Sequence, residues 1–136
     1  GIPEYDGAID SNYLPGRNLL LLSKVAVLCA LAGVYQIAMA PLADNPFADG
    51  TPEFFRAFAD VAGRALDMPL SIEIPFRALD KIEVIRRGHD LPLELTLSCI
   101  QPVDGAHCGD CTKCAERRIA FASSGVADRT SYARRR

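Results

Sequence analysis

The sequence lacks most of the features that identify a large functional class on their own. Its 136 residues carry a formal net charge of only −2, which argues against general affinity for nucleic acids. The apolar run over residues 19–43 is interrupted by polar residues, glycine and proline, so no clean stretch reaches the roughly 18 residues that a membrane-spanning helix needs. We therefore expect no membrane span and interpret this run as a buried helix followed by a buried strand.

The common phosphate-binding loops are also missing. Neither G-x-G-x-x-G nor G-x-x-x-x-G-K-[ST] occurs in the sequence, and there is no internal repeat or low-complexity linker. No segment has the pattern of an export signal. A chain of this length can bury a core of its own, and reduced cysteines without an export signal indicate a cytoplasmic location.

What the sequence does contain is a dense cysteine pattern, C-x8-C-x2-C-x2-C, formed by Cys99, Cys108, Cys111 and Cys114. Four thiolates in tetrahedral array are the preferred environment of structural zinc. Proline and glycine residues between the cysteines supply the tight turns that such a knuckle needs. Because protein ligands would fill all four positions, the pattern predicts a structural zinc ion and no catalytic one.

Three other interpretations of these cysteines stay open. An iron–sulfur cluster also uses four cysteines, and spacing alone does not exclude it. Disulfides are a second option, although nothing resembles an export signal and a fifth cysteine, Cys29, lies in an apolar run. His107 could replace one thiolate as a ligand. Since four cysteines already fill the site, we expect His107 beside the metal or in the loop, and zinc is the preferred interpretation.

Helices and strands are expected to alternate, as in half of a doubly wound α/β domain. Asn18 is expected to cap a helix that Gly33 ends. Thr51 and Pro52 are typical of the start of a second helix, whose apolar stripe we expect at Phe54, Phe55, Phe58, Val61, Ala62 and Leu66. The expected elements are helices at 19–32, from 51 onward, at 79–87 and at 114–124, with strands at 34–40 and 71–75.

The connecting segments also carry expectations. Residues 44–50 form a loop after the first strand, at the end of the sheet where open α/β domains usually bind ligands. Residues 1–14 look extended and start abruptly, as if another segment belongs upstream, and residues after Gly125 are expected to be loose. Arg134, Arg135 and Arg136 form a basic tail that is either a solvated end or a binding segment.

Three motifs occur in an informative order. The first is Tyr13-x-Pro15-Gly16-Arg17-Asn18, the second is Lys81-x-Glu83-Val84-Ile85-Arg86, and the third is the cysteine pattern followed by Arg117. In this order and at these intervals they resemble the 7-cyano-7-deazaguanine synthase family, which belongs to the PP-loop ATP pyrophosphatase superfamily. The resemblance runs from Tyr13 to about Gly125.

The resemblance implies a fold. It implies part of a Rossmann-like, doubly wound parallel sheet (adenine nucleotide alpha hydrolase-like), with a four-cysteine zinc knuckle near the carboxyl terminus. Residues 1–98 would be the carboxyl-terminal portion of the ATPase-like domain, and residues 99–136 would be the knuckle region with a closing helix and the basic tail.

The resemblance also implies an activity. The family's enzymes are ATP-dependent C–N ligases that use ATP and magnesium to convert 7-carboxy-7-deazaguanine and ammonia into 7-cyano-7-deazaguanine, a queuosine precursor. Arg17 and Lys81 would be the catalytic cations that face phosphate or substrate, and Tyr13, Pro15, Gly16 and Asn18 would join them in binding the nucleotide. On the residues alone, Arg17 and Lys81 could equally be ordinary surface side chains.

Two departures from the family pattern affect this interpretation. The superfamily's S-G-G-x-D-S loop, whose backbone amides surround pyrophosphate, does not occur in the 136 residues. Where the family has a run such as D-Y-S-G-Y-P-D-C, this chain has Asp44-Asn-Pro-Phe-Ala-Asp49-Gly-Thr51, so a different acid could be the substrate.

The resemblance and these departures together imply the expected partners. They are a carboxylate substrate and ammonia, an upstream PP-loop segment or a partner chain, and a second copy in a homodimer. The alternative function is a zinc-stabilised module that binds RNA or protein without catalysis.

Overall fold

The computed structural model describes residues 13–133, and contacts divide the chain into two units. The first unit is Leu14–Asp80, and the second contains residues 81–133. The expectations for residues 1–12 and for the basic tail lie outside the described residues. The expected division at residues 98 and 99 stays a prediction.

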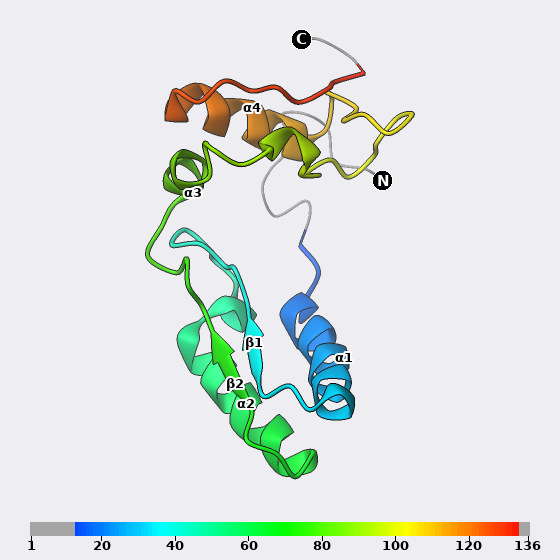
Figure 1. Cartoon of the computed structure of the whole chain (residues 1–136), viewed down its shortest axis with the longest axis vertical. Coiled ribbons are helices and arrows are strands. Elements are labelled where there is room, and N and C mark those ends of the chain that lie inside the picture. Colours follow the sequence, from blue (N-terminus) through cyan, green and yellow to red (C-terminus); the bar gives the residue numbers. More distant parts are fainter. Residues whose placement is uncertain (1–12, 134–136) are drawn as a thin grey trace. The chain divides into compact units, whose positions relative to one another are not determined.

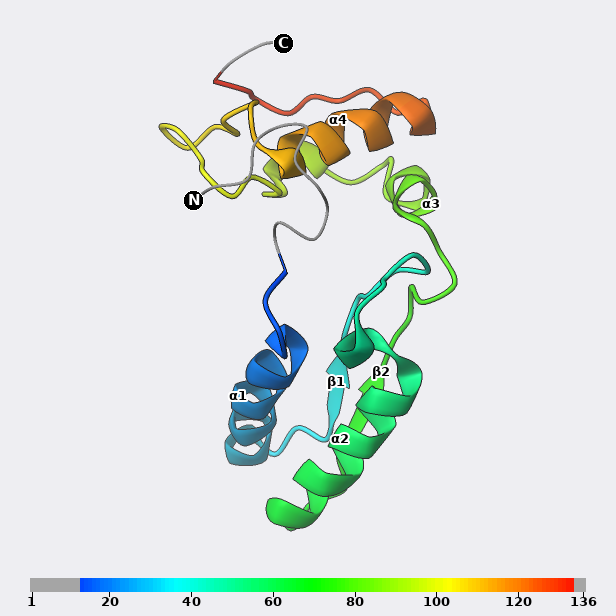
Figure 2. The same cartoon turned by 180° about the vertical axis from the view of Figure 1, so that it is seen from behind.

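The first unit contains α1 (Arg17–Ala32), β1 (Gln36–Ala38), the short 3-10 helix η2 (Ala48–Gly50), α2 (Pro52–Ala65) and β2 (Ser71–Glu73). The two strands pair in parallel, with Ile37 opposite Ile72. This confirms an α/β unit with a parallel sheet, although each strand is shorter than expected. Figure 1 shows the two strands in front of α2, and Figure 2 shows the same strands from behind, with α2 in front of them.

The core of this unit lies on one face of the two strands. Leu22 of α1, Ile37 of β1 and Phe55 of α2 form a buried cluster, and further apolar side chains of the unit pack around it. The neighbours of Ile37 in β1, Gln36 and Ala38, are both exposed. The expectation of a buried strand therefore holds for Ile37 but is wrong for Gln36 and Ala38, because the helices among residues 13–133 cover one face of the strands.

The predicted helix boundaries hold where the signals are local. The hydroxyl of Thr51 accepts a hydrogen bond from the backbone N–H of Phe54 at 3.2 Å, which confirms Thr51 as the cap of α2. Gly33 ends α1 in the left-handed conformation, with φ 65°. Val61 was expected in the apolar stripe of α2, but it is 67% exposed and thus faces away from the core.

Helix α1 differs from the expectation of burial on most sides. Its buried residues are Asn18, Leu22 and Ala26, whereas Leu28 is 63% and Leu31 is 81% exposed. One stripe of α1 packs on its own unit, and the apolar side chains outside that stripe are in contact with solvent. No helix among residues 13–133 is both long enough and apolar enough to cross a membrane.

The second unit contains α3 (Lys81–Arg87), a 3-10 helix η3 (Leu93–Leu95) and α4 (Thr112–Ser124). Helix α3 packs against α4. After Gly125, which ends α4 at φ 75°, the chain runs back and pairs with the cysteine region. The N–H of His107 donates to the carbonyl of Ser131, and the N–H of Ala133 donates to the carbonyl of His107. The expectation that the chain is loose after Gly125 is therefore wrong for residues 126–133.

Candidate metal centre and the predicted nucleotide-binding residues

The four cysteines of the pattern meet in one buried cluster, the cysteine cluster (Cys99, Cys108, Cys111 and Cys114), whose ligand atoms all lie within 4.8 Å of one another. The Sγ atoms of Cys99 and Cys111 are 3.9 Å apart, as are those of Cys108 and Cys114, and Cys111 and Cys114 are separated by 3.5 Å. Zinc–sulfur bonds of about 2.3 Å in a tetrahedron place the sulfurs about 3.8 Å apart. The donor set and its spacing therefore fit a zinc ion.

Local backbone geometry brings the sulfurs together. Gly105 and Gly109 have φ of 79° and 84°, in the left-handed region that glycine adopts without strain. Backbone N–H groups point at the sulfurs: those of Gln101 and Cys108 donate to Cys99 Sγ at 3.3 Å. Such bonds stabilise thiolate charge, because a charged acceptor strengthens a hydrogen bond. These bonds favour the Cys99 thiolate, although burial raises the pKa of the Cys99 thiol overall.

The thiols differ in how readily they lose a proton. Burial alone would raise the pKa of Cys111, but hydrogen bonds from the backbone at Ile100 and Cys114 and from neighbouring thiols lower it to about 7. Burial raises the pKa of the Cys114 thiol, and a thiolate at Cys111 raises it further. Without a cation the cluster therefore favours one thiolate over several, and a bound metal supplies the positive charge that several thiolates need.

His107 is no ligand of this cluster, in agreement with the expectation that four thiolates fill the site. Its Nε2 accepts a hydrogen bond from the backbone N–H of Ser98 at 3.0 Å, and its side chain is buried. Burial, followed by the nearby positive charge of Arg117, lowers the pKa of His107. A neutral imidazole with an unprotonated Nε2 thus fixes the segment that leads into Cys99.

Arg117, on α4, is 6% exposed and connects three segments of the second unit. Its guanidinium donates to the hydroxyls of Thr96, Ser98 and Thr130 and to the carbonyl of Leu93. It also lies over the ring of Phe121, 4.9 Å from the ring centroid. The arginine that follows the cysteine pattern is therefore a structural side chain.

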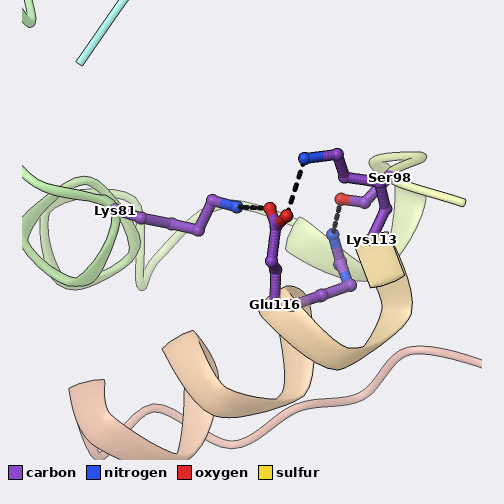
Figure 3. Close-up of polar contacts among 5 residues, drawn as sticks. Lys81, Ser98, Lys113 and Glu116 are labelled. Carbon is purple, nitrogen blue, oxygen red and sulfur yellow. Dashed lines mark hydrogen bonds and ion pairs between the residues drawn. The ribbon is translucent and has the colours of Figure 1, made fainter. Parts of the chain in front are cut away.

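Lys81 begins α3, and its ammonium group meets a carboxylate of α4. Lys81 Nζ lies 2.9 Å from Glu116 Oε2, and Lys113 Nζ lies 2.7 Å from Glu116 Oε1, as Figure 3 shows. Burial alone would raise the pKa of Glu116, but hydrogen bonds from Lys113 and Lys81 outweigh it and keep that pKa below its ordinary value. Neither Lys113 nor Glu116 is among the site residues predicted from the sequence. Their i,i+3 spacing was the only local signal, and nothing local indicated the contact with Lys81.

The Tyr13–Asn18 motif lies at the start of α1, but Asn18 is not the cap that the sequence predicted. Gly16 is the N-cap residue, with φ 68°, and no side chain of its own can cap the helix. The backbone N–H of Asn18 donates instead to Asp49 Oδ2 at 2.8 Å, and its side-chain amide donates to the Asp49 carbonyl at 2.9 Å. A carboxylate from the 44–50 loop thus satisfies the first turn of α1.

The same loop also approaches Arg17. The Arg17 guanidinium lies 5.8 Å from the ring centroid of Phe47, within the range of a cation–π contact. The structure thus places the 44–50 loop beside Arg17 and Asn18. Tyr13 and Pro15 precede Gly16 in the turn that leads into α1. Arg17 and Lys81 belong to different units, so their convergence on one ligand stays a prediction.

Comparison with known proteins identifies the family. Residues 2–125 match the family model described as "Queuosine biosynthesis protein QueC". The chain belongs to the QueC family. This confirms the resemblance on which the sequence interpretation rested.

Among the similar proteins are three named 7-cyano-7-deazaguanine synthase. The protein from Anaeromyxobacter dehalogenans is 38% identical over 135 residues, covering 93% of this chain and 58% of that protein. The protein from Azoarcus sp. is 35% identical over 136 residues (93% and 60%), and the protein from Methanopyrus kandleri is 34% identical over 138 residues (91% and 60%). This QueC-family chain therefore spans about three fifths of the length of these relatives.

Proposed function

We propose that this QueC-family chain is the carboxyl-terminal part of an ATP-dependent C–N ligase that converts 7-carboxy-7-deazaguanine and ammonia into 7-cyano-7-deazaguanine. The observation that carries the proposal is similarity to proteins named 7-cyano-7-deazaguanine synthase over more than nine tenths of the chain. The similar region includes the complete cysteine cluster and both motifs with candidate cations. The Rossmann-like doubly wound sheet is part of this proposal.

The chemistry assigns a task to each group of residues. Adenylation makes the carboxylate oxygen a good leaving group, and ammonia then forms the amide that a second ATP-dependent step dehydrates to the nitrile. Arg17 suits two-point contact with phosphate or carboxylate oxygens, whereas Lys81 acts as a point charge. Holding the reactants in line and stabilising charge on the phosphates accounts for catalysis of this kind. Magnesium would accompany ATP, and a PP-loop from an upstream segment or a partner chain would complete the site.

Zinc has a structural task in this proposal. All four positions around the ion would be filled by cysteine, so no position is open for water or substrate. When bound, zinc supplies a cross-link between the segment at Cys99 and the first turn of α4. The cysteines would then hold the start of α4 in place, and Glu116 on this helix contacts Lys81.

The test is an assay of the protein in its complete natural length. Purified protein is incubated with ATP, magnesium, ammonium and 7-carboxy-7-deazaguanine, and the nitrile and AMP are followed by mass spectrometry and chromatography. We expect AMP release that depends on the acid, with two ATP consumed for each nitrile formed, because both steps use ATP. AMP release with a different acid would assign another substrate to the same chemistry. Absence of any ATP-dependent product would instead favour a zinc-stabilised binding module.

A further inference from the structure

We propose that Glu116 is a positioning residue: it fixes the ammonium group of Lys81 for contact with an anionic group of the ligand, and Lys113 fixes Glu116 in turn. The inference rests on the proposed function, because Lys81 needs a ligand to act on. The geometry is that of Figure 3, where both oxygens of one carboxylate are occupied by different lysines. The two distances are 2.9 Å to Lys81 and 2.7 Å to Lys113.

The contact between Lys81 and Glu116 joins two helices, whereas the pairs Arg56–Glu53, Arg64–Asp60 and Lys113–Glu116 each join neighbours on one helix. The first two of these pairs are largely exposed, and Lys113–Glu116 is partly buried. Lys81 and Glu116 are 35 positions apart and join α3 to α4, and the Glu116 side chain is only 28% exposed. A partly buried pair between two elements is screened less by salt than an exposed pair, so it constrains the lysine more strongly.

The charge balance favours an additional anion at this place. Two ammonium groups share one carboxylate, which leaves one net positive charge among the three side chains. Each ammonium has three donors, and the contacts with Glu116 described among residues 13–133 use one donor of each lysine. Lys81 remains 44% exposed and can therefore be reached by a ligand. Phosphate oxygens and a substrate carboxylate share the required chemistry.

The cysteine cluster contributes rigidity to this arrangement. Glu116 and Lys113 lie in the first turns of α4, on either side of Cys114, and that helix begins directly after Cys111. A free lysine side chain must lose rotamer entropy when it binds a ligand, and a fixed partner removes part of that cost beforehand. The cluster thus anchors the helix that positions Lys81.

The first arm of the test measures the contact itself. The chain contains three lysines, Lys24, Lys81 and Lys113, so the side-chain Nζ resonances of the ¹⁵N-labelled, zinc-loaded chain can be assigned by single substitutions. We expect Glu116→Gln to shift or broaden the resonances of Lys81 and Lys113 while Lys24 keeps its own. Glu94→Gln, which changes an exposed carboxylate of the same unit, is the matched control. Zinc content is measured for every variant, so that loss of the cysteine cluster is recognised.

The second arm measures turnover in the protein of complete natural length. Glu116→Gln should raise KM for the anionic ligand about tenfold with kcat changed far less, because Lys81 remains present but is no longer fixed. Glu116→Asp should restore part of this loss, because it keeps the charge. A rise in KM for ATP identifies phosphate as the anion that Lys81 contacts, and a rise in KM for the acid identifies the carboxylate. Lys81→Ala is the reference for complete loss of the cation.

The outcomes separate the two proposals. An inactive wild-type protein whose Lys81 resonance still responds to Glu116→Gln would overturn the proposed function and, with it, the role of this contact in catalysis. An active protein in which Lys81→Ala is impaired and Glu116→Gln keeps its KM would overturn the positioning role alone. A Lys81 resonance that is equal in wild type and Glu116→Gln would overturn the contact. A KM increase in Glu116→Gln with intact zinc and rescue by Glu116→Asp supports the inference.

Discussion

Single side chains organise the second unit through hydrogen bonds that reach distant segments. Arg117 on α4 contacts the segment before Cys99, the 3-10 helix η3 and the returning chain at Thr130. This guanidinium is buried and donates several hydrogen bonds, so one side chain stabilises the folded second unit through several contacts at once.

Arg117→Ala should lower the free energy of unfolding of this unit by about 3 kcal/mol, because it removes four hydrogen bonds that a buried guanidinium donates. The free energy of unfolding of Arg117→Lys should lie between those of wild type and Arg117→Ala, since lysine keeps the charge but lacks the planar guanidinium. Urea unfolding at fixed zinc concentration measures the effect. Arg129→Ala, an exposed arginine of the same unit, is the control and should change little. A loss no greater than that of Arg129→Ala would contradict the structural role.

Cys111→Ser should abolish tight zinc binding, because the serine oxygen cannot replace the thiolate in a four-sulfur site. Binding energy on the order of 10 kcal/mol feeds the folding of such regions, so solubility should fall before any catalytic effect appears. Elemental analysis of freshly purified, reduced protein gives the metal and its stoichiometry. Cys29→Ser is the matched control, since Cys29 lies in α1 outside the cluster. Iron in the wild-type protein, or no metal at all, would show the zinc assignment to be wrong.

Asp128 gives the second unit a pH-dependent contribution to stability. Burial alone would raise its pKa, but hydrogen bonds from Thr130 and from the Tyr132 hydroxyl lower it below the ordinary value. A pKa that is lower in the folded state means that the contribution is present above the unfolded pKa of about 3.9 and is lost as pH falls through the folded pKa.

Asp128→Asn should therefore be less stable than wild type at neutral pH, by about 1 kcal/mol. The difference should shrink in acid, below about pH 4. Urea unfolding of both proteins across this range measures it, with Asp104→Asn as the exposed control. A difference that stays constant from neutral pH into acid would refute the assignment.

At the scale of elements, the sequence predicted what local chemistry determines. Thr51 with Pro52, and the glycines at 33 and 125, gave correct ends for α1, α2 and α4 because caps involve neighbouring residues. The errors involve distant partners. The carboxylate of Asp49, and not the side chain of Asn18, accepts a hydrogen bond from the first turn of α1. The chain after Gly125 pairs with His107. Neither contact has a signal in the local sequence.

The contact between Asp49 and α1 predicts that removing this carboxylate lowers the stability of the first unit. Asp49→Ala removes the carboxylate that accepts the Asn18 N–H and should destabilise the first unit by about 1 kcal/mol, the usual cost of a lost helix cap. Amide hydrogen exchange in the first turn of α1 should accelerate as well. Asp44→Ala, an exposed carboxylate of the same loop, should leave exchange there unchanged. Equal exchange in both variants would show that Asp49 does not cap the helix.

At the scale of the whole molecule, the first unit has exposed surface both on one face of its strands and on one side of α1. The face of the strands opposite the core is exposed at Gln36 and Ala38, and the exposed side of α1 carries leucine and valine side chains. Two short strands seldom form a stable open sheet by themselves. This chain covers 58% of the relative from Anaeromyxobacter dehalogenans. The expectation that an upstream segment or another chain covers this surface stays a prediction.

The last prediction concerns Arg17 and Lys81, which belong to different units. Arg17 opens α1 beside the 44–50 loop, and Lys81 opens α3, so both cations stand at helix starts, where partial positive charge favours phosphate. In the protein of complete natural length, Arg17→Ala or Lys81→Ala should lower ATP-dependent turnover by orders of magnitude, because each removes charge that stabilises the transferring phosphates. Arg56→Ala, which changes an exposed arginine on α2, is the control and should turn over normally.

Substitutions in the 44–50 loop should instead change which acid is accepted, since the loop departs there from the family pattern. AMP release by each variant and the separation of the two side chains in a nucleotide-bound crystal structure measure these expectations. Normal turnover by the Arg17 and Lys81 variants, or side chains on opposite faces of the protein, would exclude a shared site.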